Sequence, residues 1–403
     1  MLKMHPLQSR KESDDEILIG RPDLSNYIIL PEIGVEIIEM LDGGQSIEQV
    51  EQEMEERFGE PVDVLSFAQD LVVDYQFVHT VDGETVNPSV ERKDHFPWIT
   101  ERVGQFFFNK IAYVIYALVF LSGLGLTIWH GSLFPVYSDI FISSSVTVSL
   151  VSAFVVGWLF LFLHELAHLM AARSLGIGSR LGLSHRLVFM VAETNMSNIV
   201  TVEPKRRHRA FLAGMAWDAT FFGIGVWLQF AHDLGWFALP VTVLAVIKMI
   251  NVTLLMSMAF QFMFFMQTDM YYVFAALFNC NNLLANTRLY LRKFYRKHTP
   301  EEAEEWESVA MREKKVIRWY AWFCVLGFLW AVAFFALYTL RQAIEFITRT
   351  VDEMVGHAVF SAAFLDGVLL ILLTLVPFGI VVWSWIRTWN TRRAERRRRA
   401  ALQ

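Results

Sequence analysis

The stretch FLFLHELAHLMAARSLG, residues 160–176, places two histidines and a glutamate at the end of a long apolar run. Apolar runs of this length are typical of transmembrane helices, where ionisable residues are costly and usually functional. HELAH fits the pattern H-E-x-x-H, in which the two histidines share one helix face. We therefore expect His164 and His168 to bind one metal ion, with Glu165 beside them as general base. The alternative is a pair of interfacial histidines with a snorkelling glutamate.

The composition of the chain agrees with a membrane protein. Of its 403 residues, 54% are hydrophobic, and the mean hydropathy is +0.37; soluble domains seldom combine such values with long uncharged runs. The net charge of −6 argues against nucleic acid as a partner. Cys280 and Cys324 lie far apart and outside CxxC spacing, so they predict neither a disulfide framework nor a thiolate metal site.

Six segments are long and apolar enough to cross a lipid bilayer. They are residues 111–129, 146–171, 211–230, 239–266, 319–340 and 364–385. Lys and Arg gather between the second and third spans, between the fourth and fifth, and in the C-terminal tail, whereas the first two opposite loops contain none. By the positive-inside rule both termini lie in the cytoplasm, which agrees with an even number of spans and with an N-terminus that lacks a signal peptide. We expect a multi-pass protein of a bacterial plasma membrane.

A small cytoplasmic domain precedes the spans. Its predicted elements are a strand at 26–30, a helix at 33–41, a helix after Ser46, a helix after Asp63 and a strand at 77–81. Ser46 and Gln49 form an S-x-x-Q capping box, a strong signal for a helix start. The predicted fold class is mainly α: a six-helix polytopic membrane protein with a small N-terminal winged-helix (α+β) domain.

Shifts in composition set the predicted domain boundaries. They are a disordered N-terminus at 1–22, the winged-helix domain at 23–83, a linker at 84–105, the membrane domain at 106–388 and a basic cytoplasmic tail at 389–403. We interpret the arginines of the tail as topology signals rather than as a lipid-specific site.

A catalytic zinc ion takes three protein ligands and keeps one open position, so a third ligand is needed. Asp269, at the cytoplasmic end of the fourth span, is our choice, and its alternative is an ordinary interfacial aspartate. Asp218, in the third span, either supports the site or serves as an alternative ligand, or it pairs with Lys248. Asp366 begins the sixth span at the outer side, on the order of 20 Å in depth from HELAH, and is rejected. Two imidazoles and a carboxylate suit Zn²⁺, although iron or cobalt would also bind.

The N-terminal segments YIILPEIGVEIIEMLDGGQSIEQVEQEMEERFG and VLSFAQDLVVDYQFV resemble the PqqD-like domain, including the L-D-G turn before the capped helix. This resemblance covers roughly residues 20–83. It implies recognition of the leader segment of a ribosomally made peptide, which such domains take as an added strand in a groove beside the third helix.

The membrane domain resembles the site-2 protease family of intramembrane zinc metalloproteases, and more closely the peptide zinc metalloproteases found with peptide-modification systems. The matching segments are HELAHLMAARSLG, RLVFMVAETN, RRHRAFLAGMAWD and TDMYYVFAAL. In that branch the third-ligand motif reads like N-P-x-x-x-x-D-G-Y-Y, which Asp269, Tyr271 and Tyr272 match. Met270 replaces the glycine, and Met263-Phe264 stands in place of Asn-Pro. Without the proline, the fourth span can remain a continuous helix.

The loop at 181–202 contains the apolar, β-branched stretches LVFMV and IVTV. It is predicted to form a hairpin that either holds an extended peptide at the active site or packs against the cytoplasmic helix ends. Cleavage requires an extended segment, because a helix hides the carbonyl groups that are to be attacked.

These observations predict a membrane-embedded zinc metalloendopeptidase that cleaves a ribosomal peptide precursor near the cytoplasmic membrane face. We expect a peptide-modifying enzyme or a transporter as a further partner. A non-catalytic protein that docks a modified peptide for export or immunity is the second hypothesis, which Met270 favours and Glu165 opposes. A regulated intramembrane protease in signalling is the third, although the chain has no PDZ-like segment. A metal transporter would need more ionisable residues along its path than Asp218 and Lys248.

Overall fold

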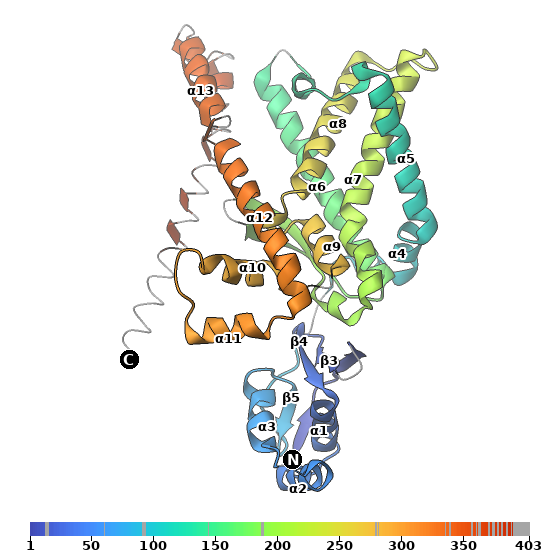
Figure 1. Ribbon diagram of the computed structural model, residues 1–403. Coiled ribbons are helices and arrows are strands. Elements are labelled where there is room, and N and C mark those ends of the chain that lie inside the picture. The colour runs from blue at the N-terminus through green and yellow to red at the C-terminus, as the bar shows by residue number, and fades with distance from the viewer. Residues whose placement is uncertain are drawn as a thin grey trace. The chain divides into compact units, whose positions relative to one another are not determined.

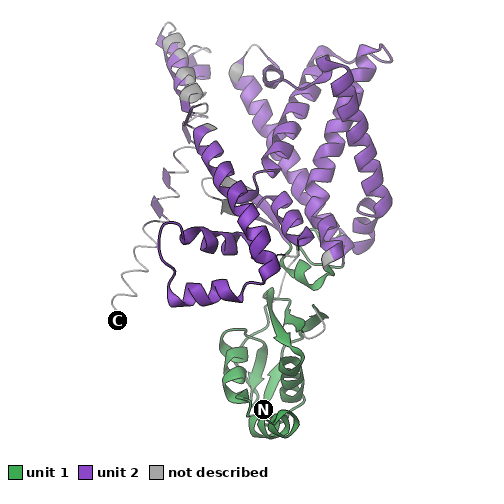
Figure 2. Ribbon diagram, viewed as in Figure 1, with its two compact units in different colours: residues 1–98, 176–180, 196–203 green, residues 99–175, 181–195, 204–403 purple. Residues whose placement is uncertain are grey.

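The computed structural model describes residues 1–12, 16–59, 61–90, 94–143, 145–186, 189–278, 280, 282–334, 336–337 and 340–355, and short pieces between 358 and 389. It is mainly helical, with 67% helix. The chain divides into two compact units, which Figure 2 colours separately. The first unit comprises residues 1–98, 176–180 and 196–203, and the second comprises 99–175, 181–195 and 204–403.

The first unit is a small, strand-rich domain with three helices among its described residues (Figure 1). In chain order its elements are β1 (Leu2–Met4), β2 (Gln8–Lys11), β3 (Glu16–Arg21), β4 (Asn26–Pro31), α1 (Glu32–Asp42), α2 (Ile47–Phe58), α3 (Val64–Val73), β5 (Val78–Val81), β6 (Glu84–Thr85) and the 3-10 turn η3 (Ser197–Thr201). The strands form two antiparallel sheets, in the orders β1-β5-β6 and β2-β3-β4. The winged-helix assignment goes further than this description and stays a prediction.

Local sequence signals start the helices of this unit where they were expected. Ser46 accepts a hydrogen bond from the Gln49 backbone N–H, and the Gln49 side chain accepts one from Ser46 N–H, which completes the predicted capping box. Asp63 caps α3 by accepting from Ser66 N–H at 2.8 Å. The apolar faces of these helices meet in one core, whose fully buried members include Leu41, Val50, Met54, Leu71 and Phe77.

The prediction of a disordered N-terminus at 1–22 is wrong, because this segment supplies β1, β2 and β3. Ile17 is paired with Leu30 and Ile19 with Ile28. The formation of strand β3 therefore depends on its pairing with β4 rather than on the composition of the segment itself. The expected linker at 84–105 is also partly folded. It contributes β6 and the helix α4 (Glu101–Phe107). In addition, the Asn87 side chain donates to the carbonyl oxygens of Val72 and Val78.

The second unit holds the long helices. Its elements in chain order are α4, α5 (Lys110–Trp129), η1 (Gly131–Leu133), η2 (Tyr137–Ile140), α6 (Val146–Ser174), β7 (Arg180–Arg186), β8 (Phe189–Asn195), α7 (Pro204–Asp233), α8 (Val241–Gln261), η4 (Phe264–Met266), α9 (Asp269–Leu277), α10 (Leu283–Arg292), α11 (Pro300–Ser308), α12 (Met311–Phe334) and α13 (Leu340–Val355). Helix α7 packs against α5, α6 and α8, as Figure 1 shows. Strands β7 and β8 pair with each other as the predicted hairpin.

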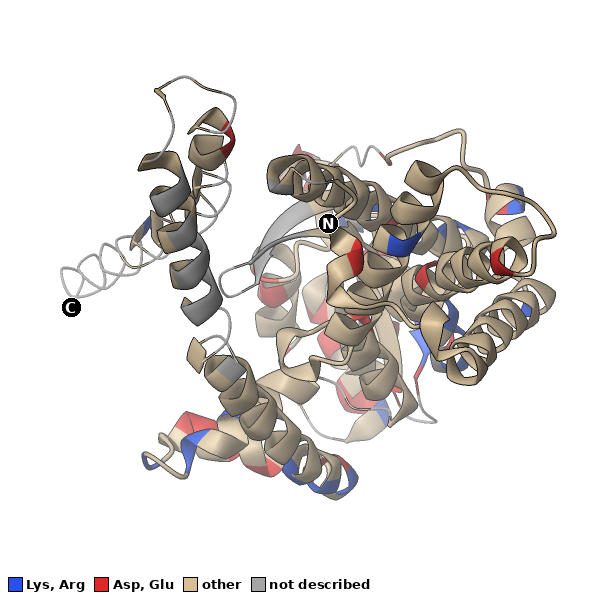
Figure 3. Cartoon of the chain, turned by 90° about the horizontal axis from the view of Figure 1, so that it is seen from above, with Lys and Arg blue, Asp and Glu red and all other residues tan. Residues whose placement is uncertain are grey.

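Five helices of the described chain are long and apolar enough to span a membrane. They cover Glu101–Trp129, Thr147–Ser174, Lys205–Asp233, Val241–Gln261 and Met311–Ala333. Viewed along the bundle in Figure 3, charged residues are sparse among these helices. The sixth predicted span, 364–385, and the tail at 389–403 lie largely outside the described residues, so the six-helix count stays a prediction.

Candidate metal centre

Helix α6 carries the HELAH residues. Ser145 caps its first turn by accepting from Val148 N–H, and the helix then runs without interruption to Ser174. His164 and His168 lie one helical turn apart and are 3% and 2% exposed, and Glu165 between them is 8% exposed. Three ionisable side chains are thus buried within a helix that could cross a membrane, where an ordinary solvated face is not available to them.

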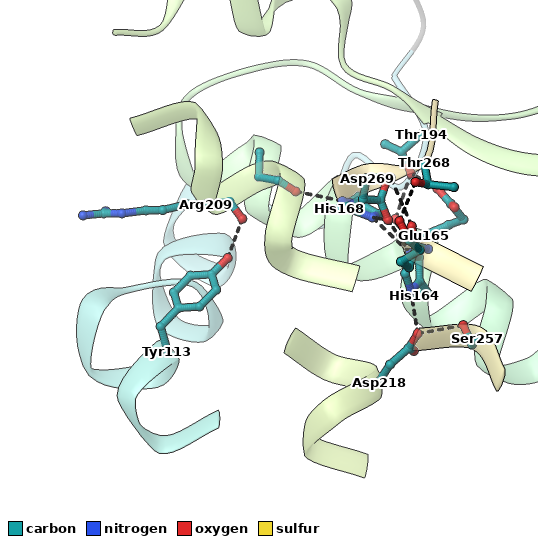
Figure 4. A network of polar contacts seen from close by, with 12 residues as sticks. Tyr113, His164, Glu165, His168, Thr194, Arg209, Asp218, Ser257, Thr268 and Asp269 are labelled. Atoms are coloured by element: carbon teal, nitrogen blue, oxygen red, sulfur yellow. Dashed lines mark hydrogen bonds and ion pairs between the residues drawn. The ribbon is translucent and has the colours of Figure 1, made fainter. Parts of the chain in front are cut away.

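Asp269 joins the two histidines although it lies about a hundred positions further along the chain. Its Oδ2 atom is 2.9 Å from His164 Nε2 and 3.1 Å from His168 Nε2, and the two Nε2 atoms are 3.2 Å apart (Figure 4). These atoms form a group that could hold a metal ion. The structure therefore brings together the three residues that the sequence proposed as ligands.

The outer nitrogen atoms of both rings also have partners. His168 Nδ1 is 2.7 Å from the Ala210 carbonyl oxygen, which can only accept, so the proton of this ring lies on Nδ1. His164 Nδ1 is 2.9 Å from Asp218 Oδ2, and Ser257 Oγ donates to the same carboxylate oxygen at 3.0 Å. When each ring is neutral with its proton on Nδ1, the lone pair of its Nε2 atom faces Asp269.

In this neutral form three acceptor atoms converge on one point, because both Nε2 atoms and the Asp269 carboxylate offer lone pairs. The repulsion between these lone pairs is relieved by a proton on Nε2 or by a metal ion bound among the three atoms. A carboxylate or a backbone carbonyl that receives the outer N–H is also the usual support of a metal-binding histidine. The donor set and its supports fit a metal ion.

Asp269 reaches this point because α8 ends early. The helix stops at Gln261, the chain turns through η4, and Gln267 adopts a left-handed backbone with φ of 55°. The Gln261 side chain accepts from Asp269 N–H at 3.0 Å, and Thr268 Oγ1 donates to the Gln261 carbonyl oxygen at 2.6 Å. The predicted fourth span at 239–266 is therefore not one continuous helix, although no proline lies at the break. Polar side chains satisfy backbone groups freed there.

Glu165 stands outside the ligand group and points to the hairpin. Thr194, on β8, places its Oγ1 atom 2.8 Å from Glu165 Oε2 and 2.9 Å from the Glu165 carbonyl oxygen. The predicted hairpin is thus present, and it contacts the residue that the sequence proposed as general base.

The two other aspartates that the sequence analysis considered as ligands have different positions in the structure. Asp218 is 1% exposed and supports His164 together with Ser257, rather than pairing with Lys248. Asp366 accepts from Ser145 Oγ at the opposite end of α6 from HELAH, in agreement with its rejection as a ligand.

Several contributors to the site were not singled out from the sequence. They are Thr194, Gly214, Ser257, Gln261 and the Ala210 carbonyl group. Only Gln261, a polar residue at the end of an apolar run, carried a local signal. No family model, curated protein or solved structure matches the chain.

Proposed function

We propose that the chain is a membrane-embedded zinc metalloendopeptidase that cleaves a ribosomally made peptide precursor near the cytoplasmic face of the plasma membrane. One observation carries this proposal: the two buried Nε2 atoms and the Asp269 carboxylate converge next to a glutamate that is not among them. A purely structural site does not need that glutamate, whereas peptide hydrolysis needs a base beside the ligands.

The size of the ligand triangle supports zinc. Ligand atoms about 2.0–2.1 Å from a tetrahedral zinc ion lie about 3.3 Å from one another. The three separations here, 2.9, 3.1 and 3.2 Å, are close to that value. The first two would widen by a few tenths of an ångström on binding, a movement within reach of side-chain torsions.

Each residue has a separate part in the proposed reaction. A bound zinc ion would lower the pKa of water toward neutrality and polarise the peptide carbonyl group. The Glu165 carboxylate would take a proton from the attacking water and pass it to the amine that leaves. Asp218 and the Ala210 carbonyl would hold the two imidazole rings in orientation throughout.

Substrate recognition is assigned to the N-terminal unit and to the hairpin. The leader segment would bind the strand-rich N-terminal unit, and the segment to be cut would lie extended along the β7–β8 hairpin, which contacts Glu165 through Thr194. With both units in one chain, binding of the leader raises the effective concentration of the scissile bond. A cytoplasmic location of both termini agrees with a precursor that need not cross the membrane.

The experiment measures zinc content and proteolysis on the same detergent-purified protein, with fluorescein-labelled casein as a generic substrate. We expect wild type to contain one zinc ion per chain and to cut casein. Glu165→Gln should retain the zinc but lose activity roughly 10²- to 10⁴-fold, because the ligands remain and the base is gone.

The ligands are tested by two aspartate variants. Asp269→Ala should lose zinc, and Asp218→Ala should bind it more weakly by about 10- to 100-fold, as expected for a residue that only orients a ligand. Full proteolysis by Glu165→Gln would contradict the mechanism. A wild type without zinc would favour instead the peptide-docking protein, for which the Met270 substitution is the supporting observation.

A further inference from the structure

Among the described residues, Thr194 is the hydrogen-bond partner of the Glu165 carboxylate from outside helix α6. Thr194 Oγ1 lies 2.8 Å from the Glu165 carboxylate and 2.9 Å from the Glu165 carbonyl oxygen. One hydroxyl therefore shares its single proton between the carboxylate of this side chain and the backbone carbonyl oxygen of the same residue. Because a glutamate has three side-chain torsions, such a bridge selects one rotamer among many.

The importance of this bridge follows from the part assigned to Glu165. A general base must lie within hydrogen-bond reach of the proton that it takes, and a displacement of about 1 Å can cost roughly 10²-fold in rate. Glu165 is not held by the metal, and it is 8% exposed, so solvent does not orient it either. The hydroxyl of Thr194 is in the position to do so.

The segments that flank the hairpin belong to the first unit. Residues 176–180 lead into β7 and residues 196–203 follow β8, and both are grouped with residues 1–98 (green in Figure 2). Within that unit, the Asn198 amide donates to the Pro22 carbonyl oxygen at 3.2 Å. Gly178 approaches Asp94 so closely that an added Cβ would come within 2.7 Å of its carboxylate. The segment after β8 is thus anchored by a hydrogen bond to the N-terminal chain, and the segment before β7 lies close to Asp94.

We propose that Thr194 is the positioning residue of Glu165, and that the anchoring of the hairpin-flanking segments to residues 1–98 helps to set the place of the Glu165 carboxylate. This inference rests on the proposed protease function. The link is covalent as well as through contacts: a shift of the segments 176–180 and 196–203 moves the hairpin ends, and the hairpin carries the hydroxyl that holds the base.

The first test removes the hydroxyl. Thr194→Val keeps the shape of the side chain and should lower kcat for labelled casein about 10- to 100-fold, with KM and zinc content unchanged. Thr194→Ser keeps the hydroxyl and should restore most of the activity. Equal activity of Thr194→Val and wild type would overturn the positioning role. Loss of activity in both variants would assign Thr194 a packing role instead.

The second test breaks the anchor. Asn198→Ala should lower kcat less than Thr194→Val does, and in the Thr194→Val background it should have no further effect, because both changes act through the same hydroxyl. Effects that simply add would overturn the link between anchor and base.

A measurement that does not depend on catalytic activity distinguishes this inference from the proposed function. In a variant with Glu165→Cys and Thr194→Cys, a short bis-methanethiosulfonate reagent should join the two thiols, and Asn198→Ala should slow the reaction. The native Cys280 and Cys324 are buried, and the wild type, whose sequence contains only these two cysteines, gives the background. The absence of a cross-link, or a cross-linking rate that Asn198→Ala does not change, would overturn the inference even if the wild type proves not to be a protease. An inactive wild type with an efficient, Asn198-dependent cross-link would overturn only the protease function.

Discussion

The position of the His164 ring depends on the absence of a side chain at Gly214, on α7. An added Cβ there would come within 2.4 Å of His164 Nε2 and within 2.6 Å of two further ring atoms. Real Cβ atoms essentially never approach so closely, so any larger residue forces the ring or the helix to move. Because His164 is also held by Asp218, the ring has little freedom to yield.

Gly214→Ala is therefore expected to weaken zinc binding about 10- to 100-fold by displacing a ligand while leaving all the predicted ligands in the chain. The measurement is the zinc content after dialysis against a graded series of chelator concentrations. Gly157→Ala, on α6, is the matched control, because a Cβ at that position meets nothing within 4 Å. Identical zinc retention in the two variants would contradict the argument.

At the scale of elements, α5 and α7 approach each other through two glycines. A Cβ on Gly223 would come within 2.5 Å of the Val119 carbonyl oxygen, and one on Gly123 would come within 2.8 Å of the Gly223 Cα atom. Helices that could lie in a membrane gain their packing from such small residues, since lipid is as apolar as their side chains. Helix α7 carries Asp218 and Ala210, so its placement against α5 also supports the metal centre.

Gly223→Ala is expected to destabilise the protein by about 1–3 kcal/mol, because backbone atoms of α5 must retreat. The measurement is the temperature midpoint of unfolding in detergent. Gly125→Ala on α5 is the control, since its added methyl group meets nothing within 4 Å and alanine favours a helix. A midpoint of Gly223→Ala at or above that of Gly125→Ala would show that the helices do not meet in this way.

Some helix boundaries are determined by local sequence, and others depend on contacts made after the chain has folded. The start of α2 follows from Ser46 and Gln49 alone, because a capping box satisfies backbone groups within four residues. The end of α8 does not follow from its own residues. It depends on Gln261 meeting Thr268 and Asp269 after the chain has turned, and an apolar sequence around the break favours continuation.

At the scale of the whole molecule, we expect the N-terminal unit to lose stability as the pH falls. His5 is buried, and His5 Nε2 and His79 Nδ1 lie 3.0 and 3.1 Å from the same Asn87 carbonyl oxygen. Burial, and next the positive charge of Arg21, lower the pKa of His5 below its ordinary value of 6.5, although Asp23 and the hydrogen bond to Asn87 oppose this. Folded His5 therefore stays neutral where the unfolded chain already takes up a proton.

The sign of the effect follows from this difference. Above about pH 6.5 both states are neutral and the stability is complete; as the pH falls through 6.5 toward the folded pKa, the unfolded state binds the proton and the stability declines. Hydrogen exchange of residues 84–90 in the full chain, corrected for intrinsic rates, should lose protection between pH 7.5 and 5.5. His5→Gln, whose neutral amide can still donate to Asn87, should show a flatter profile. Equal losses in both proteins would rule out His5 as the cause.

The residues 160–176 were enough to determine that a long apolar helix carries two histidines and a glutamate, because the spacing of side chains on a helix is fixed by covalent geometry. The choice of Asp269 as the third member of the group was argued from sequence, but only the tertiary structure separates it from Asp218, since both are isolated acids in apolar surroundings. Their different parts arise from the chain reversal after Gln261 and from the packing of α7 against α6. The parts of Thr194 and Gly214 could not be predicted from the sequence for the same physical reason. Their contacts with the HELAH residues join positions that are 29 or more residues apart, and only the packed fold brings such positions together.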